Sequence, residues 1–404
     1  MMHGEAIVCF APDLWGDIWR NRHRLLSVFA RTNRIVYVEP RTTVRSLWRR
    51  VRSGTFDRKA LGAPRVEEVQ RNLFVYHDPV LLPRTRKALV GPAIDRARDR
   101  SLQAALQKLG ISRPILWLVR PDCWDVPGKL HEKALLYQIV DDYLSYPGVT
   151  ENGRRRLDRE ERAIASRADL VIVTSEHLLQ LKRGLSSNVV LVRNGVDEHT
   201  LEEGEKTDGP IPAALAAATR PIYGYVGGIT EKLDLGLLES LARRLDGGRL
   251  GTLALVGPTN VSGESAVTVA RLRSNPGVVF PGPVPAADVP SYIRAFDVAL
   301  IPYRVGDQSR AIDPLKLYEY LAFGKPTVCA DIPSVDSFRR LLYVASGPDD
   351  FARQLDEAAR ERAPHLVAER RAAAHDNSWV RRAEQISAQL EGLLAKKCGS
   401  ESSG

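Results

Sequence analysis

The chain has 404 residues, which is long enough for two domains, and its 44% hydrophobic and 26% charged residues are typical of a globular enzyme. It contains no apolar run of membrane-spanning length, its N-terminus reads as a strand and not as a signal peptide, and its four scattered cysteines favour a reduced cytoplasmic protein without a disulfide framework or zinc site. The net charge of +9 predicts an acidic partner, for which nucleic acid, an anionic membrane and a phosphorylated substrate are all open.

Apolar strands alternate with helices through the first half of the chain. Continuous apolar strands of this kind are typical of a parallel sheet covered on both faces, so we expect an N-terminal Rossmann-like domain over 1–200. Helices are expected over 20–31 and 94–109. The expected strands are 6–10, 34–39, 72–76, 115–119, 135–140, 170–174 and 189–192.

A basic stretch with interspersed apolar residues follows the second expected strand. It can lie on an anionic membrane surface, which would make the protein peripheral at the inner face of the cell membrane, and it can equally be a solvated loop. No nucleic-acid-binding motif accompanies it, so nucleic acid is not an expected partner. The stretch consists of Arg41, Arg45, Arg49, Arg50, Arg52, Arg58 and Lys59 around Leu47, Trp48, Val51 and Phe56.

The alternating pattern starts again after a change of composition over 198–220, where we expect a linker, 201–220, that includes an entry helix. We expect a second α/β domain over 221–375, then a helix over 376–396 and a disordered tail over 397–404. Two doubly wound parallel-sheet domains joined by a linker leave a cleft, which is a favoured place for a ligand. The strands expected in the second domain are 221–226, 252–256, 278–280, 298–301 and 327–330.

Residues 313–326 predict one short helix with both ends marked. Asp313 can cap it, Pro314 can occupy its first position, and Gly324 and Pro326 can end it. A strand precedes the helix and another follows it, which places its N-terminus at the carboxyl edge of a parallel sheet. The free N–H groups and positive dipole at that end form a ready anion site.

Lys316 and Glu319 share one face of this helix. The pair can be an ordinary exposed ion pair. At this sheet edge, however, a cation beside an anion site and a carboxylate one step beyond it suit a nucleoside diphosphate, whose phosphates would meet Lys316 and whose ribose hydroxyls would meet Glu319.

Two further segments have residues suited to a phosphate or a base. Gly227 and Gly228 end the first strand of the second domain and let a backbone approach a phosphate, or they are tight-turn glycines without a ligand. Lys232, near the start of the next helix, can reach a phosphate or lie on the surface. The turn 280–285, which contains Val284, can present a main-chain amide to a base edge or simply connect a strand to a helix.

Carboxylates at the end of a parallel strand are well placed for general base catalysis. Asp141 and Asp142 follow the strand 135–140, although one of them can also cap a helix. His23, near the first strand–helix loop, is an alternative proton acceptor. Asp13, Trp15 and Arg20 occupy that same loop. Asn194, at the end of the first domain, can contact a ligand across the cleft or belong to a simple interdomain turn.

These residues resemble the GT-B glycosyltransferases, and in particular the bacterial enzymes of teichuronic-acid and exopolysaccharide synthesis that use nucleotide-sugar donors. The segment 313–326 is similar to their donor-site helix. Weaker similarities cover most of the chain and are strongest over 221–335. They comprise Tyr225–Gly228, Leu255–Pro258, Asp297–Tyr303, Asn194–Asp197, Ser175 and Ser378–Trp379, the last resembling a closing helix that crosses back to the first domain.

The resemblance implies roles for individual residues. Glu319 would bind the donor ribose and Lys316 its diphosphate. Asp141 or, as the best candidate, Asp142 would be the catalytic base in the acceptor domain. The other expected donor-site residues are Gly227, Gly228, Lys232, Val284, Tyr303, Asp313 and Leu317.

The chain departs from the pattern of retaining relatives at two positions. Ala311 stands where they have the first of two glutamates, and Ile229 follows Gly228 where they have an arginine. Both departures place a retaining mechanism in doubt.

The sequence therefore predicts a glycosyltransferase that uses a nucleotide-diphosphate sugar, UDP-linked by preference, and a glycan or lipid-linked acceptor. The resemblance implies no cofactor and no metal, because lysines and helix N–H groups supply the positive charge and no Asp-x-Asp motif is present in the donor region. Two alternatives remain open at this point. They are a nucleotide-sugar 2-epimerase of the same fold and a non-enzymatic basic module that binds anionic polymers.

Overall fold

The structure is a computed structural model that describes residues 1–17, 19–52, 65–83, 90–146, 149–206 and 208–401. It divides into two compact units, the first formed by 1–193 and 382–404 and the second by 194–381. Of the sequence predictions, Phe56, Arg58, Lys59 and the tail residues 402–404 lie outside the described residues.

The first unit contains an eight-stranded sheet in the order β3-β4-β2-β1-β5-β6-β7-β8. Every neighbouring pair is parallel except β3 with β4. Residues of β1, β2 and β5 are almost all buried, as the continuous apolar runs predicted. The strands are β1 Ala6–Phe10, β2 Arg34–Val38, β3 Val66–Gln70, β4 Leu73–Tyr76, β5 Ile115–Leu118, β6 Ala134–Ile139, β7 Leu170–Val173 and β8 Val189–Leu191.

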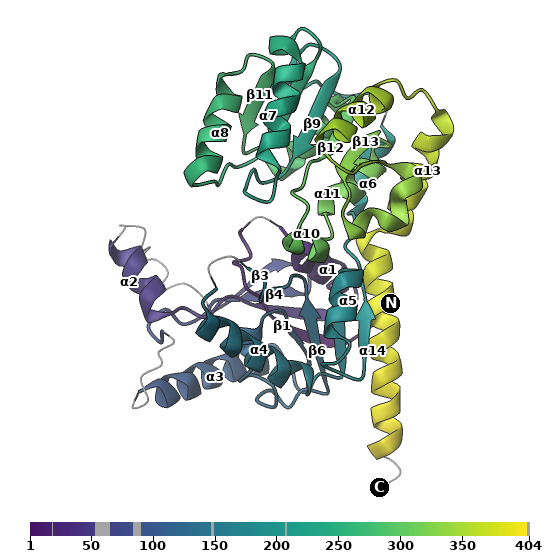
Figure 1. Cartoon of the computed structure of the whole chain (residues 1–404). Coiled ribbons are helices and arrows are strands. Elements are labelled where there is room, and N and C mark those ends of the chain that lie inside the picture. Colours follow the sequence, from purple (N-terminus) through teal and green to yellow (C-terminus); the bar gives the residue numbers. More distant parts are fainter. Residues whose placement is uncertain (18, 53–64, 84–89, 147–148, 207, 402–404) are drawn as a thin grey trace. The chain divides into compact units, whose positions relative to one another are not determined.

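Helices connect the strands of this sheet (Figure 1). The expected helices 20–31 and 94–109 are confirmed as α1 and α3. The helices are α1 Asn21–Phe29, α2 Val44–Arg52, α3 Gly91–Lys108, α4 Glu151–Ala165 and α5 Glu176–Lys182, with the greater part of α14 Trp379–Glu401.

The edge strand β3 was missed. Its sequence, Val-Glu-Glu-Val-Gln, has no apolar run, and most of its side chains are exposed because only one neighbour covers an edge strand. Asn72 begins the return to β4 with a φ of 63°, a conformation that asparagine tolerates better than most residues.

The second unit contains a six-stranded sheet in the order β11-β10-β9-β12-β13-β14, with all pairs parallel. This is the strand order of a doubly wound dinucleotide-type fold. The strands are β9 Ile222–Val226, β10 Thr252–Val256, β11 Val278–Gly282, β12 Val298–Ile301, β13 Thr327–Ala330 and β14 Tyr343–Ala345. All five strands expected in this domain are confirmed, and the three-residue β14 is additional.

Helices α6, α11 and α13 of this unit contact one another beside the sheet (Figure 1). The helices are α6 Glu198–Glu205, α7 Leu235–Arg244, α8 Gly263–Ser274, α9 Val289–Ala295, α10 Asp307–Ala311, α11 Leu315–Ala322, α12 Pro348–Ala359 and α13 Pro364–Asp376. Short 3-10 helices in the chain span Pro121–Cys123, Ala213–Leu215, Asp246–Gly248, Ala286–Asp288 and Pro333–Leu341.

Two expectations at the ends of the domains need correction. The segment 201–220, expected to be a linker with an entry helix, contains the end of α6 and only a short 3-10 helix at Ala213–Leu215, and Leu215 is buried in the core of the second unit. The expected disordered tail is helical as far as Glu401, because α14 continues through it.

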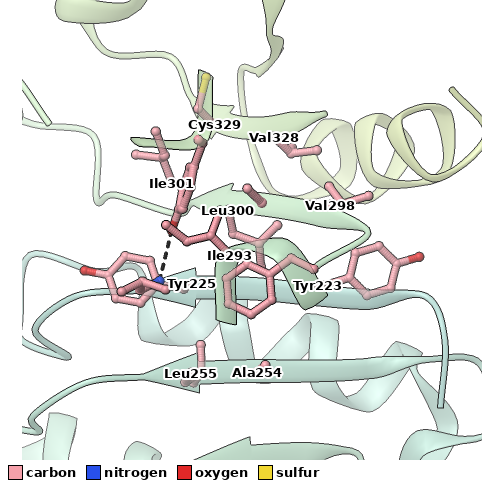
Figure 2. Close-up of a cluster of buried hydrophobic side chains, with 14 of the residues drawn as sticks. Tyr223, Tyr225, Ala254, Leu255, Ile293, Val298, Leu300, Ile301, Val328 and Cys329 are labelled. Carbon is pink, nitrogen blue, oxygen red and sulfur yellow. Dashed lines mark hydrogen bonds between the residues drawn. The ribbon is translucent and has the colours of Figure 1, made fainter. Parts of the chain in front are cut away.

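The core of the second unit lies between β9, β10, β12 and β13 and the helix α9 (Figure 2). Gly224 of β9 packs directly under the Phe296 ring, and a Cβ on Gly224 would lie 2.1 Å from Phe296 Cγ. The absence of a side chain here is what lets the ring approach the strand.

We predict that Gly224→Ala lowers the free energy of unfolding of the second unit by about 1–3 kcal/mol, because the added methyl group overpacks the contact with Phe296. Urea unfolding measures this change. The matched control is Gly236→Ala on α7, where a Cβ would make an ordinary 3.5 Å contact with Asp234 Oδ1. Equal stability of the two variants would contradict the prediction.

Candidate functional site

The sheet of the second unit reverses its strand order between β9 and β12. β9 comes first in the chain and lies inside the sheet, with β10 and β11 on one side and β12, β13 and β14 on the other. The loops leaving β9 and β12 therefore diverge, and ligands of open α/β sheets bind in the crevice that this leaves at the carboxyl edge. Gly227 and Tyr303 lie in those two loops.

Glycines at this edge allow backbone and side chains to come very close. Gly227 has a φ of 142°, and a Cβ there would lie 2.9 Å from Tyr225 Oη and 3.1 Å from Lys316 Cε. A Cβ on Gly257, in the loop after β10, would lie 2.1 Å from the Gly227 carbonyl oxygen. The turn after β9 thus requires glycine both for its conformation and for the space that Lys316 occupies.

The Lys316 ammonium lies against this turn, among tyrosines. Its Nζ donates a hydrogen bond to Tyr303 Oη at 2.7 Å and lies 5.0 Å from the ring centroids of both Tyr225 and Tyr303. Tyr225 Oη in turn donates to the Gly228 carbonyl oxygen at 3.0 Å. Tyr320 Oη accepts from the Val226 N–H at 2.9 Å, which ties α11 to the end of β9.

This environment keeps Lys316 protonated. Burial by itself would lower the pKa of the ammonium, but the surrounding Tyr225, Tyr303 and Tyr320 oxygens raise its pKa overall. Burial also raises the pKa of Tyr225 to about 12, with the Lys316 charge opposing that change. The raised pKa favours the charged form of Lys316 beside the glycine turn at the carboxyl edge of the sheet.

The helix that carries Lys316, α11, differs from the prediction at its N-terminus only. Asp313 does not cap α11 and Pro314 is not its first residue, because Pro314 itself is the N-cap. The predicted C-terminus is confirmed. Gly324 has a φ of 63°, its N–H donates to Leu321 O at 2.9 Å, and the Lys325 N–H donates to Tyr320 O at 3.0 Å, which is a Schellman motif.

Asp313 is instead a buried acceptor that joins two segments. Its Oδ2 accepts from the Asn194 N–H at 2.6 Å, and Tyr318 Oη donates to Oδ1 at 2.9 Å. The Asn194 amide also donates to the Asp313 carbonyl oxygen at 2.7 Å. Both predicted residues therefore lie together, in contacts that fix the entry to α11.

Glu319 and Leu317, the other predicted residues of this helix, differ in exposure. Glu319 is half-buried, one turn from Lys316, and its charge contributes to the raised pKa values of Tyr225 and Tyr320, for which burial is the main cause. Leu317 is completely buried in the hydrophobic core. Leu317 therefore stabilises the helix, and its side chain is not available to a ligand.

Lys232 lies in a loop that pairs with the segment following Tyr303. Leu233 bridges Tyr303, the Arg304 N–H donates to Lys232 O at 2.9 Å, and the Asp234 N–H donates to Pro302 O at 2.9 Å. The side chain of Lys232 is exposed, and α7 begins three residues later with Asp234 as its cap. Lys232 is thus held at the same edge as Lys316, although it does not begin the helix.

The remaining expectations for this unit concern Val284 and the two departures from the family pattern. Val284 is half-buried in the turn after β11, whose Gly282 carbonyl accepts from the Gly257 N–H at 2.9 Å. Ala311 and Ile229 are both completely buried. Those two positions therefore offer neither a carboxylate nor a cation to this edge.

In the first unit, Asp141 and Asp142 follow β6 and have different partners. Asp141 accepts from the Tyr146 hydroxyl and from the Asp142 N–H, the latter at 3.1 Å. Asp142 Oδ1 lies 3.8 Å from Lys182 Nζ, which donates to Glu161 Oε2 at 2.8 Å. The Lys182 and Glu161 side chains are each only 4% exposed, and they border a pocket of about 310 Å³ together with Asp142.

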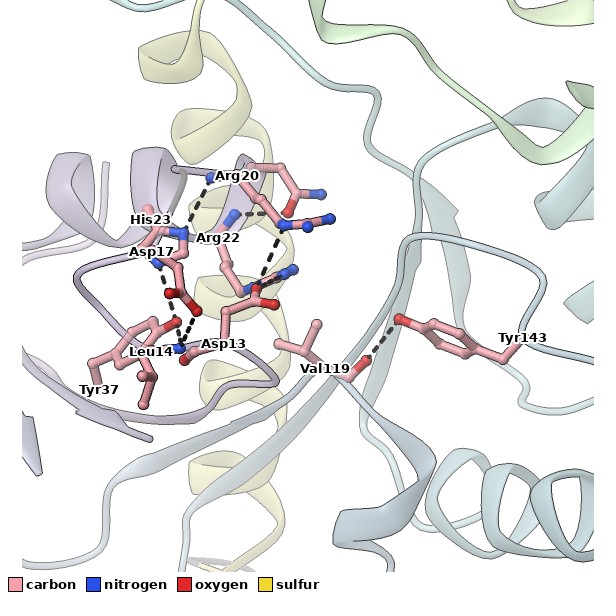
Figure 3. A network of polar contacts seen from close by, with 10 residues as sticks. Asp13, Leu14, Asp17, Arg20, Arg22, His23, Tyr37, Val119 and Tyr143 are labelled. Carbon is pink, nitrogen blue, oxygen red and sulfur yellow. Dashed lines mark hydrogen bonds and ion pairs between the residues drawn. The ribbon is translucent and has the colours of Figure 1, made fainter. Parts of the chain in front are cut away.

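His23 is buried and uses both ring nitrogens within the protein (Figure 3). Nδ1 accepts from the Arg20 N–H at 3.1 Å. Nε2 lies 3.2 Å from Tyr37 Oη, which itself donates to the Asp13 carbonyl oxygen at 2.9 Å, so Nε2 carries the proton. Burial, with the Arg22 charge, lowers the pKa of His23 to about 4. This geometry disfavours His23 as a base for a substrate.

The other residues predicted for this loop support its conformation. The Asp13 carboxylate accepts from Arg22 Nε at 2.8 Å and has Arg20 Nε at 3.8 Å (Figure 3). The Trp15 N–H donates to Glu39 Oε1 at 3.1 Å. Asp13 is therefore a structural anchor, whereas the Arg20 side chain remains 61% exposed.

Sequence reasoning predicted Tyr303, but it missed Tyr225 and Tyr320 as neighbours of Lys316 and the lysine behind Asp142. Tyr320 is four residues from Lys316 and so lies on the same helix face, and Tyr225 immediately precedes Val226 and the predicted glycines. Those spacings could have identified both tyrosines. Lys182 lies 40 residues beyond Asp142 in the chain, and nothing local in the sequence signals its contact with that carboxylate.

Among the described residues, no group of three or more His, Cys, Asp and Glu side chains is arranged to hold a metal ion. No helix in the same part of the chain is both long and apolar enough to cross a membrane. The exposed residues Val44, Trp48 and Val51 lie on α2, where the expected contact with an anionic membrane stays a prediction.

The chain is similar to known glycosyltransferases in part of its sequence. Residues 220–361 match the family model described as glycosyl transferases group 1. The chain is 30% identical over 196 residues to TuaH of Bacillus subtilis, a protein whose name assigns it to teichuronic acid biosynthesis as a glycosyltransferase. This match covers 48% of each protein, so the chain spans about half the length of that relative.

Solved structures resemble nearly the whole chain at low identity. Sucrose-phosphate synthase from Thermosynechococcus elongatus is 17% identical, with a TM-score of 0.67 over 97% of this chain and 100% of that one. Anabaena HepE, solved in complex with UDP and glucose, is 14% identical, with a TM-score of 0.62 over 95% and 99%. The chain has the GT-B fold that was expected, with two Rossmann-like parallel-sheet units.

We predict that protonation of His23 destabilises the first unit in acid. The pKa of His23 is about 4 in the folded chain, below the value of about 6.5 for an unfolded histidine. The unfolded state therefore binds the proton first, and stability is lost as the pH falls from about 6.5 towards 4. At pH 4.5 this loss is about 2–3 kcal/mol.

Urea unfolding at pH 7 and pH 4.5 measures the effect. His23→Asn keeps an acceptor for the Arg20 N–H and removes the titration, so its stability should fall by about 2–3 kcal/mol less than that of the wild type between the two pH values. His3→Asn, at an exposed position, is the control. The same pH dependence in all three proteins would refute the assignment.

Proposed function

We propose that this chain, whose residues 220–361 match the family model of glycosyl transferases group 1, transfers a sugar from a nucleotide-diphosphate donor to the hydroxyl group of an acceptor. The observation that carries the proposal is the Lys316 ammonium, held by Tyr303 against the Gly227 turn at the carboxyl edge of β9. A fixed cation, a glycine turn whose backbone has no side chain over it and a helix N-terminus together can bind a diphosphate.

The donor would bind to the second unit through a few residues. Lys316, the first N–H groups of α11 and the Gly227–Gly228 turn would bind the diphosphate, with Lys232 at its exposed side. Glu319 would accept hydrogen bonds from the ribose hydroxyls, and the turn at Val284 would contact the base. The complex of HepE with UDP and glucose supports UDP as the nucleotide.

The acceptor would bind to the first unit, with Asp142 as the base. Asp142 would take the proton from the acceptor hydroxyl while that oxygen forms a bond to the anomeric carbon. The bond from the anomeric carbon to the diphosphate oxygen breaks with its electron pair, and Lys316 stabilises the negative charge that develops. These proposed reaction steps need no metal ion.

Lys182 and Glu161 support Asp142 over Asp141 as this base. Lys182 Nζ, paired with Glu161, lies 3.8 Å from Asp142 Oδ1 and can hold that carboxylate in position. The Asp141 carboxylate instead accepts a hydrogen bond from the Tyr146 hydroxyl, so Asp141 supports the conformation of the loop. A glycan acceptor is consistent with the teichuronic acid biosynthesis named for the Bacillus subtilis relative.

We predict that Lys316→Met reduces kcat/KM by about 10²–10³-fold, because the departing diphosphate loses its main cation. Glu319→Gln should raise the KM for the nucleotide sugar by about tenfold or more, because it weakens a charged hydrogen bond to the ribose. Release of UDP, GDP or ADP from the corresponding glucose donors, together with thermal stabilisation by each nucleotide, measures both effects.

Lys206→Met is the matched control, because Lys206 is 56% exposed and pairs with Glu203 on α6. If neither Lys316→Met nor Glu319→Gln changes nucleotide binding or turnover, the donor site is refuted. Conversion of a nucleotide sugar without any acceptor would instead indicate an epimerase.

We predict that Asp142→Asn lowers kcat by about 10²–10⁴-fold with little change in donor KM, because the amide cannot accept the acceptor proton. Asp141→Asn is the matched comparison, since it changes the neighbouring carboxylate by the same atoms. Single-turnover measurements with saturating donor separate the chemical step from binding. A larger loss in Asp141→Asn than in Asp142→Asn would reverse the assignment.

A further inference from the structure

A pocket of about 310 Å³ lies in the first unit, beside the carboxyl end of β6. It is bordered by Asp142 and by the helices α4 and α5, which are labelled in Figure 1. Ligand pockets in proteins span about 300–1,000 Å³, so this pocket is at the small end of that range. Its volume therefore suits a single small ring and not a chain of several sugar units.

The Lys182–Glu161 pair holds two walls of this pocket together. Lys182 Nζ, on α5, donates to Glu161 Oε2, on α4, at 2.8 Å, and both side chains are only 4% exposed. A buried ion pair adds little net stability, because the loss of hydration offsets the attraction between the charges. Its contribution here is the fixed spacing of the two helices and a cation kept 3.8 Å from Asp142 Oδ1.

The charged side chains that line the pocket balance one another. Besides the pair of Lys182 with Glu161, Arg162 Nε donates to Asp158 Oδ2 at 3.0 Å. A charged ligand would compete with these pairs. A neutral ligand with hydroxyl groups can instead donate to the carboxylates and accept from the cations without breaking them. The basic and acidic residues of the lining are Arg154, Arg162, Lys182, Asp142, Asp158 and Glu161.

The Asp142 carboxylate is partly open to a ligand in this pocket. Its Oδ1 is buried beside Lys182 and has no hydrogen-bond partner among the described residues, while the side chain as a whole is 15% exposed. A ligand would therefore reach this carboxylate at Oδ2, which can accept a hydrogen bond from a hydroxyl group. Such a contact is the one that a general base makes with the hydroxyl that it deprotonates.

Leucines add apolar surface to the same pocket. Leu181 of α5 is 48% exposed, although the neighbouring Lys182 is buried. Leu144 and Leu185 also line the pocket and are half-buried. Ligand sites combine apolar contacts with a few polar groups that fix orientation. This combination suits a pyranose, whose hydroxyl groups project from the ring edge and whose C–H groups form apolar faces.

We propose that this pocket binds the terminal sugar of the acceptor, and that this sugar is a neutral pyranose with Leu181 against its ring and one hydroxyl group on Asp142. Arg154, an exposed residue of the lining, binds a second hydroxyl group. The inference rests on the proposed function for the identity of the ligand as the acceptor. The pocket belongs to the first unit alone, however, and its binding can be tested without a donor.

Calorimetric titration of the full chain with defined methyl glycosides tests the proposal. The neutral probes are the methyl β-glycosides of glucose, galactose and N-acetylglucosamine, and the charged counterparts are those of glucuronic acid, galacturonic acid and glucosamine. We expect at least one neutral probe to bind about tenfold more tightly than its charged counterpart. Its affinity should be the same at low and high salt, because an uncharged ligand is not subject to screening.

Variants assign the binding to this pocket. Leu181→Ala should weaken binding of the preferred glycoside about tenfold, and Leu181→Met should restore most of it, because methionine keeps the apolar contact. Leu81→Ala, at a 70% exposed position of the same unit outside the pocket, is the matched control. Arg154→Ala should also weaken binding, whereas Arg155→Ala, at a neighbouring position of α4 that is 73% exposed and outside the lining, should behave as the wild type.

Transfer assays with the same glycoside as acceptor give a second readout. Leu181→Ala should raise the KM for the glycoside about tenfold and keep kcat and the donor KM within about twofold, because Leu181 contacts the acceptor equally in the ground state and the transition state. A loss of kcat without a change in the KM for the glycoside would contradict the assignment of Leu181 to acceptor binding.

Three results would overturn the proposal. They are no binding of any neutral glycoside to the wild type, equal or tighter binding of the charged counterpart, and an equal effect of Leu181→Ala and Leu81→Ala. This inference and the donor site fail separately. UDP-induced thermal stabilisation with no glycoside binding refutes the pocket alone, and glycoside binding without any response to a nucleotide refutes the donor site alone.

Discussion

The candidate donor site of the second unit depends on one interaction, the hydrogen bond from the Lys316 ammonium to the Tyr303 hydroxyl beside the Gly227 turn. A cation placed among buried groups is costly unless its protons are bound and its charge is compensated. The hydrogen bond that defines the position of this ammonium is to the Tyr303 hydroxyl. Hydroxyl oxygen and the negative faces of two tyrosine rings stabilise it. Such a cation can attract an anion.

Contacts at both ends of α11 fix the position of Lys316 beside the Gly227 turn. α11 can approach the end of β9 because Tyr320 binds the Val226 N–H and because Gly227 has no side chain. At its other end, α11 is packed tightly against α6, where a Cβ on Gly204 would lie 2.2 Å from the Ala322 carbonyl oxygen. The Asp313 contacts with Asn194 and Tyr318 fix the entry to the helix. The position of one ammonium group is thus set by contacts at both ends of a short helix.

The sequence predicts the fold well because the strands are buried on both faces, and their apolar runs are visible without knowledge of tertiary contacts. It fails at β3, where exposure removes the apolar run, and at α14, where helical structure continues into a Gly- and Ser-containing tail. The Schellman end of α11 is predictable because Gly324 encodes it locally. The start of α11 is not, because Asp313 has a tertiary partner in Asn194 that outcompetes capping.

The same distinction applies to the charged residues of both units. Lys316 and Glu319 could be chosen because they are close in sequence on one helix. The burial of His23 could not, because it results from Trp15, Tyr37 and the Arg22–Asp13 pair folding over the ring. Local spacing therefore identifies candidate groups, and tertiary burial decides which of them remain available for proton transfer. His23 is lost to that role, whereas Asp142, whose side chain is 15% exposed, stays the proposed base.

The buried positions Ala311 and Ile229 limit the groups that can act on a diphosphate at the sheet edge. Because both side chains are completely buried, no carboxylate from residue 311 and no cation from residue 229 can act at the sheet edge. Positive charge at this edge of the second unit is offered by Lys316, Lys232, the exposed Arg304 that pairs with Lys232, and the N-terminus of α11. Lys232 is exposed and screened by water, so most of the electrostatic stabilisation must come from Lys316 and the helix. The tyrosine enclosure, which keeps Lys316 protonated and fixed, is therefore the feature on which leaving-group stabilisation would chiefly depend.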